Sequence, residues 1–418
     1  MKRYFVLLAL LCGVCAAADE KLVSIFDGKT LNGWKVCQGY ASYRVEDGTI
    51  VGKTAKGSPN SFLCTTREYG DFILEFDAMT DPALNSGVQI RSHHARSGQV
   101  FQVLQEGTLL QGQIFHAQLK DGKLIEKKMD TGRVYGPQIE TANDDSGTSG
   151  GIWDEARRRM WLNSTPDEAA KKAYKRNEWN HYRVVAVGDS MKVWLNGVLC
   201  ADVHDPMDQT GFLGLQVHAY TGEKPLEARW RNIRIQDLGR HVWMPLSDGK
   251  TFEGWSKRGG GTWTIEDGAF HAKSIPGNKN VGYLVSDRSF KDFTVRVRVR
   301  IPQGNSGFFV RADKETLAAY EVELDANKRT GGFWETGPGG RGWVIGPEDN
   351  SAVVANGWSV MTASLHGHRI VFHVNGVKTV DLPNDAQGRL EGHIALQVHG
   401  KFDTDVWFKD VAILVPEK

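Results

Sequence analysis

The sequence predicts an all-β protein built from two tandem jelly-roll β-sandwiches. Three observations carry this prediction: an internal duplication, apolar residues with a period of two, and glycine-rich turns with almost no helix signal. The chain has 418 residues, which is more than one hydrophobic core usually supports. Two domains of ordinary size are therefore expected.

The duplication is visible at the level of motifs. Residues 27–34 read Asp-Gly-Lys-Thr-Leu-Asn-Gly-Trp and return at 248–255 as Asp-Gly-Lys-Thr-Phe-Glu-Gly-Trp. Further matches keep their order: 85–91 with 305–311, 150–153 with 331–334, 196–198 with 375–377, and 215–218 with 396–399. The offset falls from about 220 residues to about 180 between the second and third matches. We therefore expect a first domain over 19–238 with an insertion near 92–134, and a second domain over 241–418.

Local patterns predict the elements inside each copy. Residues 72–78 and 294–300 alternate between apolar and polar side chains, as half-buried strands do. The Asn-Gly pairs at 196–197 and 375–376 predict two-residue hairpins, since both residues tolerate positive φ. One helix is expected, with Thr165 as N-cap.

The net charge limits the kinds of partner that are expected, and the N-terminal residues predict where the protein is located. The net charge is +1, from 51 basic and 50 acidic residues, which argues against nucleic acid or an anionic membrane surface as partner. Two basic residues, an apolar run over 5–11 and three alanines at 16–18 predict a signal peptide over 1–18, and no later segment could span a membrane. We expect a periplasmic or extracellular protein. A lipoprotein formed through Cys12 or Cys15 is the less favoured alternative.

The cysteines and loop carboxylates leave the metal content open. Removal of the leader leaves Cys37, Cys64 and Cys200, so at most one disulfide can form, and Cys37–Cys64 is the conceivable pair. The spacing matches no cysteine metal motif, and no cofactor is predicted. Calcium at residues 143–145 (Asn-Asp-Asp) is possible, although such a loop more often forms a turn.

Large polar residues recur at i and i+2 on several expected strands, where they share one face. The first copy contributes Gln89 with Arg91, Gln138 with Glu140, and Gln216 with His218; the second contributes Arg311, Glu321 with Glu323, and Gln397 with His399. Such a set favours a ligand-binding face over a merely solvated one. Taken alone, His218 could be a structural histidine and Arg91 a structural ion-pair partner.

Three tryptophans are candidates for stacking on a sugar. Trp153, Trp161 and Trp334 follow glycine-rich turns and lie close to polar residues such as Asp154 and Glu335. Core packing is the alternative for each of them.

Two catalytic templates fit poorly. The glucanase pattern Glu-x-Asp-x-x-Glu begins at Glu323 and Asp325, but Lys328 stands where the final glutamate should be. No serine-nucleophile motif occurs. Because no dinucleotide fingerprint follows a strand, sugar oxidation by this chain itself is not expected.

The motifs together resemble the 3-keto-disaccharide hydrolase domain, also described as a 3-keto-glucoside lyase/hydratase domain. The first copy carries the family marks at 26–34, 85–91, 178–180, 195–197, 214–218 and 231–233, and residues 150–162 are typical of one branch. The second copy departs from the pattern at 356–359 and 409–411, although its Tyr320–Glu323 strand is closer to the family than residues 136–140 are. The resemblance covers nearly all of the mature chain.

The resemblance implies a concanavalin A-like fold and cleavage of 3-keto-glycosides by elimination and hydration. It also implies an oxidised saccharide as partner and a separate sugar oxidoreductase upstream. By position, the expected roles are Glu140 or His218 as base or acid, Arg91 and Gln89 at the enolate, and Gln138 and Gln216 on hydroxyls. Either copy could be active, and the first is favoured. A carbohydrate-binding module and a structural module remain alternatives.

Overall fold

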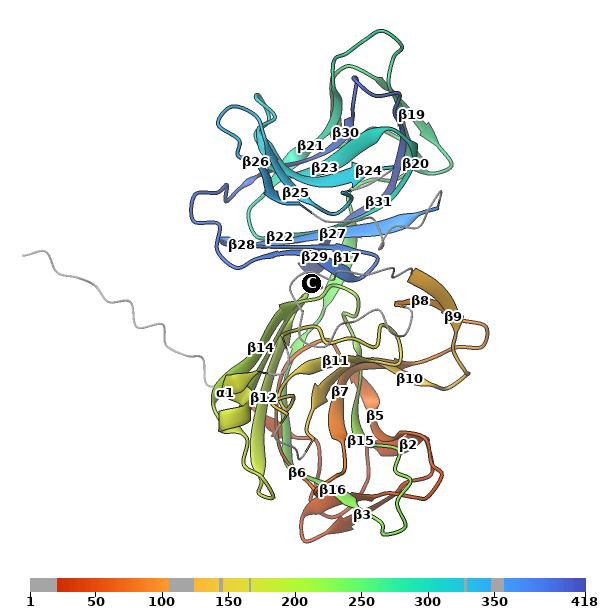
Figure 1. The fold of residues 1–418 in the computed structure, drawn as a ribbon, viewed down its shortest axis with the longest axis vertical. Helices are drawn as coiled ribbons and strands as arrows, with labels where there is room; N and C mark the ends of the chain where they lie inside the picture. The colour runs from red at the N-terminus through yellow and green to blue at the C-terminus, as the bar shows by residue number, and fades with distance from the viewer. Residues whose placement is uncertain (1–20, 105–123, 143–145, 165–166, 327–328, 347–356) are drawn as a thin grey trace, which may run out of the picture.

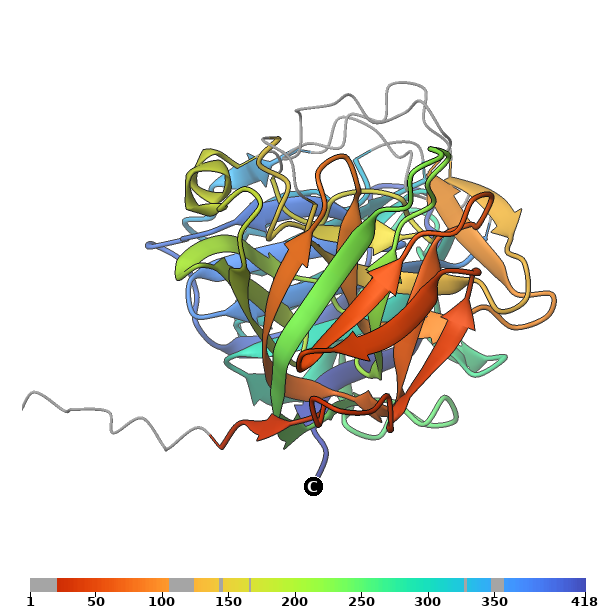
Figure 2. The ribbon, with the colours of Figure 1, turned by 90° about the horizontal axis from the view of Figure 1, so that it is seen from below.

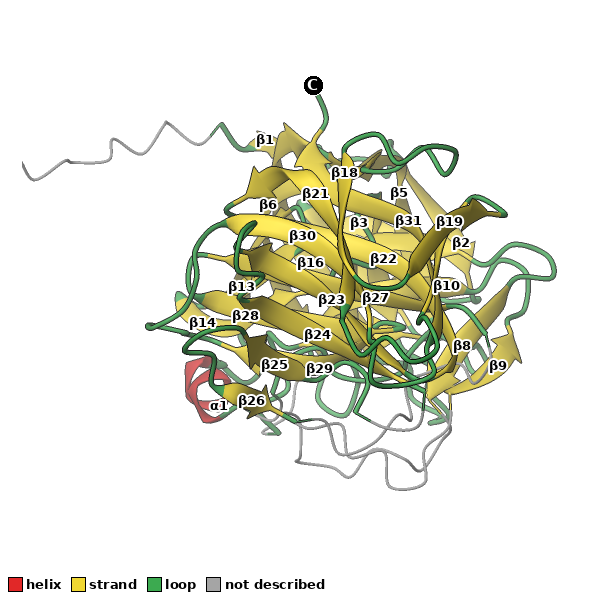
Figure 3. Cartoon of the chain, turned by 90° about the horizontal axis from the view of Figure 1, so that it is seen from above, coloured by secondary structure: helices red, strands yellow, loops and turns green. Residues whose placement is uncertain are grey.

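The computed structural model describes residues 21–104, 124–142, 146–164, 167–326, 329–346 and 357–418. Two β-sandwiches lie one above the other along the long axis of the molecule (Figure 1). Strands dominate both of them, and one short helix is visible (Figure 3). The predicted fold class is confirmed.

The first sandwich consists of two antiparallel sheets. Its support sheet contains β1 (Val23–Ser24), β3 (Ser42–Glu46), β4 (Thr49–Lys53), β6 (Asp71–Thr80), β12 (Asn180–Val187), β13 (Ser190–Leu195), β14 (Val198–His204) and β16 (Glu227–Gly239). Its polar sheet contains β2 (Trp34–Gln38), β5 (Ser61–Tyr69), β7 (Ser86–His94), β10 (Val134–Glu140), β11 (Ile152–Glu155) and β15 (Gly211–Val217). The order across the polar sheet is β11-β10-β7-β15-β5-β2; Figure 2 shows this sandwich from below.

The second sandwich repeats this plan. Its support sheet contains β17 (His241–Pro245), β19 (Thr262–Glu266), β20 (Ala269–Lys273), β22 (Phe293–Gln303), β27 (Ser359–His366), β28 (Arg369–Val374), β29 (Val377–Leu382) and β31 (Asp405–Pro416). Its polar sheet contains β18 (Trp255–Gly259), β21 (Gly282–Phe290), β23 (Asn305–Ala312), β24 (Ala319–Asp325), β25 (Phe333–Thr336), β26 (Gly342–Ile345) and β30 (Gly392–Val398). The order across this polar sheet is β18-β21-β30-β23-β24-β25-β26.

A separate apolar core fills each sandwich. In the first, Leu74 and Val184 of the support sheet pack with Val88 and Ile139 of the polar sheet. Residues of the polar sheet alternate, so the side chains between these apolar positions point away from the core. That outward side is called the outer face below.

The predicted hairpins form. Asn196 and Gly197 have φ of +48° and +85°, and Asn375 and Gly376 have φ of +50° and +78°, as a two-residue turn requires. The helix α1 (Glu168–Ala173) begins later than predicted. Its N-cap is Asp167, whose carboxylate accepts a hydrogen bond from the Ala170 N–H at 2.8 Å. The expected cap, Thr165, lies outside the described residues.

The first copy contains an insertion, and the junction between the two copies is short. Between β7 and β10 the first copy adds the hairpin of β8 (Val100–Leu104) and β9 (Leu124–Lys128), which lies at the rim of the sandwich (Figures 2 and 3). Only Arg240 separates β16 of the first copy from β17 of the second. Within the described residues, no helix has the length and apolar character needed to cross a membrane.

The two sandwiches touch through polar groups. The buried carboxylate of Asp189 accepts hydrogen bonds from Thr294, at 2.8 Å, and from Ser364, both in the second copy. Arg158 donates to the Gly376 carbonyl at 2.7 Å. A small cavity at this contact is lined by Arg158, Met160, Trp161, Leu162, His204, Asp205, His373, Gly376 and Lys378.

Candidate functional site

The outer face of the first polar sheet carries two rows of side chains in strand register. The first row runs through Cys64, Gly214, Gln89, Gln138 and Trp153. The second runs through Phe62, Gln216, Gly87 and Glu140. Residues directly opposite each other on paired strands lie on the same face, so sequence-predicted Gln89, Gln138, Glu140 and Gln216 are brought together.

These polar side chains are buried rather than hydrated. Gln89 and Gln216 are 0% exposed, Gln138 is 2% exposed and Glu140 is 4% exposed. Buried polar groups are costly unless they are hydrogen-bonded. The hydrogen-bond partners of these side chains therefore show which polar groups are satisfied within the protein.

A chain of hydrogen bonds orients Glu140. The Ser92 hydroxyl donates to Gln89 Oε1 at 2.8 Å, and Gln89 Nε2 donates to Gln138 Oε1 at 3.0 Å. Gln138 Nε2 then donates to Glu140 Oε2 at 3.4 Å. The amide of Asn85 donates to the other oxygen, Glu140 Oε1. The carboxyl is thus positioned from both sides by amide N–H groups.

Gln216 breaks this pattern of satisfied groups. Within the described residues, neither its Nε2 nor its Oε1 has a hydrogen-bond partner, although both atoms are buried. A buried amide with both ends unpaired costs about 1–3 kcal/mol per group unless something else fills the need. Its donor and acceptor are matched by a hydroxyl group, which offers both functions.

The second copy keeps the frame. Asn305 donates to Glu323, as Asn85 does to Glu140, and Gln397 stands where Gln216 does, with its Oε1 also buried and unpaired among the described residues. Glu321 occupies the place of Gln138, because both pair with the central strand and with the tryptophan of the edge strand.

The environment of the second copy is less polar. Phe309 and Ala312 stand where Gln89 and Ser92 are in the first copy, and they belong to an apolar cluster on the outer face. Burial raises the pKa of Glu321 well above its usual value, and the charge of Glu323 adds to the effect. Burial also raises the pKa of Glu323 to about 7, although the Asn305 hydrogen bond opposes it. A carboxyl in this range can exchange protons near neutral pH.

The Asn-Ser-Gly motif has a structural explanation in both copies. The Ser86 hydroxyl donates to the Gln216 carbonyl at 2.8 Å, and Ser306 donates to the Gln397 carbonyl at 2.6 Å. A Cβ on Gly87 would lie 2.5 Å from Cδ of Gln138, so glycine makes room for that side chain. The motif therefore builds the floor of the outer face.

The arginine of the same motif does not point to this face, which corrects the predicted roles of Arg91 and Arg311. A bulge after Gln89 gives Arg91 a φ of +44° and turns its side chain away. Its guanidinium donates to the carbonyls of Gly70 (2.8 Å) and Gly188 (2.6 Å) and pairs with Asp71 (3.0 Å).

Arg311 repeats this arrangement in the second copy. With φ of +51°, it donates to the carbonyls of Lys291, Gly367 and Arg389. Both arginines tie three chain segments together. Because these donors already serve backbone carbonyls, neither guanidinium is placed to stabilise an enolate.

The two histidines lie beyond the strands that carry Gln216 and Gln397. His218 is half-buried, and its Nδ1 contacts the Ala219 carbonyl at 2.9 Å. The His399 ring packs edge-on against Phe402, with ring centroids 4.8 Å apart, and burial lowers its pKa. The hydrogen bonds described for these two rings are local and do not join them to Glu140 or Glu323.

Tryptophan pairs border the rows. Trp153 and Trp161 meet edge to face with centroids 5.3 Å apart, and Trp334 meets Trp343 in the same way at 5.2 Å. Trp153 is in register with Gln138, and Trp334 with Glu321. Trp343 was missed by the sequence analysis, although a second tryptophan follows the first by eight or nine residues in each copy.

Asp154 does not belong to the site, which corrects its prediction as a substrate-binding residue. It is 0% exposed, and its carboxylate accepts from Arg157 (2.9 Å) and from Arg158. Although burial opposes it, these two guanidinium groups hold the pKa of Asp154 below its usual range. The group is a structural ion cluster.

Two clusters in the described part of the chain could hold a metal ion. They are Asp189 with His204 and His366 at the contact between the sandwiches, and Cys37 with Cys64 and His94 on the first polar sheet. The thiols of Cys37 and Cys64 are free. The loop at 143–145 considered for calcium lies outside the described residues.

The sequence matches one family model twice. The model described as the 3-keto-alpha-glucoside-1,2-lyase-like domain matches residues 21–236 and again residues 242–414. The chain belongs to this family. Each sandwich is therefore one 3-keto-alpha-glucoside-1,2-lyase-like domain, and the predicted resemblance is confirmed for both copies. No curated protein matches the sequence.

Solved structures show a similar fold at low identity. A carbohydrate-binding module of family 66 from Bacillus subtilis is 21% identical, with 38% of this chain and 93% of that chain covered and a TM-score of 0.33. A lichenase from a mouse hindgut metagenome is 13% identical, covering 42% and 99%, with a TM-score of 0.32. The laminarinase catalytic domain from Thermotoga petrophila is 9% identical, covering 43% and 100%, with a TM-score of 0.32.

Proposed function

We propose that this protein cleaves 3-keto-glycosides by elimination followed by hydration, and that the outer faces of its polar sheets hold the sugar. One observation carries the proposal. In both copies a buried glutamate, Glu140 or Glu323, is held by an asparagine amide in the same rows as a glutamine, Gln216 or Gln397, that has unpaired buried polar atoms. The family membership supplies the substrate class.

The chemistry needs one base, one acid and donors for an oxyanion. A ketone at C3 acidifies the C2 proton, so a carboxylate can remove it. The electron pair forms the C1–C2 double bond as the C1–O bond breaks, and the leaving oxygen takes up a proton. Water then adds its oxygen to C1 and a proton to C2, which completes a net hydrolysis.

The base is Glu140 in the first copy and Glu323 in the second. Each is buried on the outer face and is aimed by its asparagine. In the second copy, burial and the charge of Glu323 raise the pKa of Glu321 and favour its protonated form, which suits it to deliver the proton to the leaving oxygen. His218, just beyond Gln216, is the corresponding candidate acid of the first copy.

Sugar hydroxyls pair with Gln216 and Gln397, because each presents buried polar atoms without a protein partner among the described residues. The tryptophan pairs at the edge of each sheet offer rings on which the apolar face of a sugar can stack. A sugar oxidoreductase must supply the ketone. Because residues 1–18 have the pattern of a signal peptide, the proposal includes export of the protein, with the reaction outside the cytoplasm.

The test is to incubate the full mature chain with a 3-keto-disaccharide or with its unoxidised parent and to follow release of the second sugar by mass spectrometry. Release from the keto form alone is expected, and it should be lost in the Glu140→Gln/Glu323→Gln double variant. The two single variants report which copy is active. Binding of the saccharide without release would instead support a carbohydrate-binding module, and absence of both would support a structural module.

A further inference from the structure

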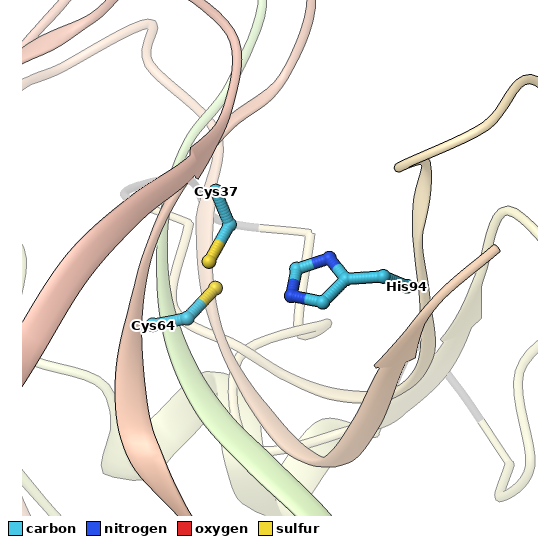
Figure 4. A group of neighbouring side chains, drawn as sticks. All are labelled: Cys37, Cys64 and His94. Carbon is cyan, nitrogen blue, oxygen red and sulfur yellow. The ribbon is translucent and has the colours of Figure 1, made fainter. Parts of the chain in front are cut away.

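A second group of reactive side chains lies on the outer face of the first polar sheet. Cys37, Cys64 and His94 come from β2, β5 and the end of β7. Their ligand atoms all lie within 4.8 Å of one another. The two sulfur atoms point toward each other, and the imidazole of His94 faces both of them (Figure 4).

Local geometry builds this group. Val36 pairs with Leu63 and Gln38 pairs with Phe62, so Cys37 is an extra residue in a β-bulge. Lys35 pairs with Cys64, and Cys37 follows Lys35 by two residues, so Cys37 shares the face of Cys64. The ring of His94 stacks on Phe212, with centroids 4.5 Å apart and planes 28° apart, which holds the imidazole in place.

The second copy lacks all three groups together. Arg258, three residues after the shared tryptophan, stands in the place of Cys37, and β18 pairs with β21 without a bulge. Val285 stands in the place of Cys64, and Lys314, three residues after the shared arginine, stands in the place of His94. Shared architecture therefore does not require these residues, and their joint presence marks a property of the first copy alone.

We propose that Cys37, Cys64 and His94 bind one thiophilic divalent cation, best Zn²⁺, through two sulfurs and one imidazole nitrogen. Tetrahedral zinc with bonds of about 2.3 Å to sulfur and about 2.0 Å to nitrogen needs ligand atoms somewhat under 4 Å apart. The present spacing reaches this after small side-chain movements. Binding displaces the thiol protons, so two thiolates and a neutral imidazole hold the ion.

The cluster adjoins the polar rows. A Cβ on Gly214 would lie 3.5 Å from the Cys64 sulfur and 3.3 Å from Cβ of Gln89, so the cysteine and the glutamine are neighbours across that glycine. Within the described residues, no fourth side chain completes the group. Water or a ligand oxygen would fill this position, as in zinc sites that stay open to substrate.

The test uses the full chain, reduced and stripped of metal, titrated with Co²⁺ alone and then with Zn²⁺ alone. One equivalent of Co²⁺ should give an intense thiolate-to-metal absorption band, which Zn²⁺ then abolishes. Cys37→Ser and His94→Ala should each weaken Zn²⁺ binding by about 100-fold or more. Cys200→Ala removes the remaining free thiol of the described residues and should leave both the band and the affinity unchanged.

Cys37 and His94 are only partly buried, so their variants test the site even if Cys64→Ser fails to fold. Co²⁺ binding without a thiolate band, or a band that survives Cys37→Ser, would overturn the proposal. So would isolation of the chain with a Cys37–Cys64 disulfide that, once reduced, takes up no Co²⁺. None of these readouts depends on turnover of a sugar, so the metal proposal and the proposed function fail separately.

Discussion

The two copies share one frame and differ in the chemistry placed on it. In both, an asparagine aims a buried glutamate, a serine ties the floor strand to its neighbour, and an arginine staples three segments. The first copy then surrounds Glu140 with the amides of Gln89 and Gln138. The second places Phe309 and Glu321 at those positions.

The difference separates what the copies share from what distinguishes their carboxyl groups. Among the shared residues, the serine, the glycine and the arginine satisfy backbone groups or make room, whereas the glutamate, its asparagine and the glutamine form the proposed site. The positions that differ set the electrostatic environment of the glutamate carboxyl group. In the first copy they supply amide donors, and in the second they supply another carboxyl group and apolar surroundings.

Replacing Arg91 or Arg311 should cause the largest losses of unfolding free energy, and the two losses should differ. Arg91→Met leaves the Asp71 carboxylate, 4% exposed, without its guanidinium, so a loss of about 3–5 kcal/mol of unfolding free energy is expected. Arg311→Met uncovers only carbonyls and the half-exposed Asp292, so about 1–3 kcal/mol is expected. Urea unfolding of the two variants measures both values. Equal losses would contradict the assignment of Asp71 as a buried partner.

Stability of the second copy should depend on pH through Glu323. Its pKa is raised from 4.5 to about 7, so the stabilisation is complete below pH 4.5 and is lost as the pH rises through 7. The loss is on the order of 3 kcal/mol. Glu323→Gln should remove the part of the pH dependence that Glu323 contributes and leave the part from Glu321, while Glu253→Gln, at an exposed turn, should reproduce the wild-type profile. An unchanged profile in Glu323→Gln would refute the buried environment.

Gly87 and Gly307 should not tolerate the methyl group of an alanine. In Gly87→Ala the new Cβ would meet Gln138 at 2.5 Å, and in Gly307→Ala it would meet Cγ of Glu321 at 2.8 Å. Each variant should lose about 1–3 kcal/mol of unfolding free energy. Each should also lose saccharide binding. Calorimetry and a binding titration measure the two effects. Gly346→Ala, whose Cβ would meet nothing closer than 3.9 Å, is the control.

The tryptophan pairs should give the smallest effect. Trp153→Ala and Trp334→Ala should each weaken saccharide binding by about 1 kcal/mol, or roughly fivefold in Kd, at the copy that carries the change. Trp243→Ala, on β17 of the support sheet, should leave Kd unchanged. If all three variants bind alike, the sheet edges do not contact the sugar.

Much of the fold could be read from periodicity and repetition. The duplication, the alternating strands and the Asn-Gly hairpins follow from local backbone preference, so they needed no tertiary information. The face of Gln138 and Glu140 was predicted by simple alternation. Alternation failed at Arg91, because a bulge adds one residue to the count and turns the side chain elsewhere.

The rest depends on contacts distant in sequence. The sequence predicts Asp154 as a sugar contact, but Arg157 and Arg158 surround its carboxylate. Nothing in the spacing of Cys37 and Cys64 indicates that a histidine from a third strand lies beside both thiols. The burial of Gln216 with unpaired polar atoms is likewise a property of packing, which no local pattern encodes.

The most direct test of elimination and hydration follows the C2 proton. A 3-keto-disaccharide turned over in D₂O should yield a 3-keto sugar carrying deuterium at C2 by mass spectrometry and NMR, well above the exchange seen without protein. The label should vanish, together with turnover, in Glu140→Gln/Glu323→Gln. A 3-keto sugar released without deuterium at C2 would contradict the account, because it would mean direct displacement at C1 without removal of the C2 proton.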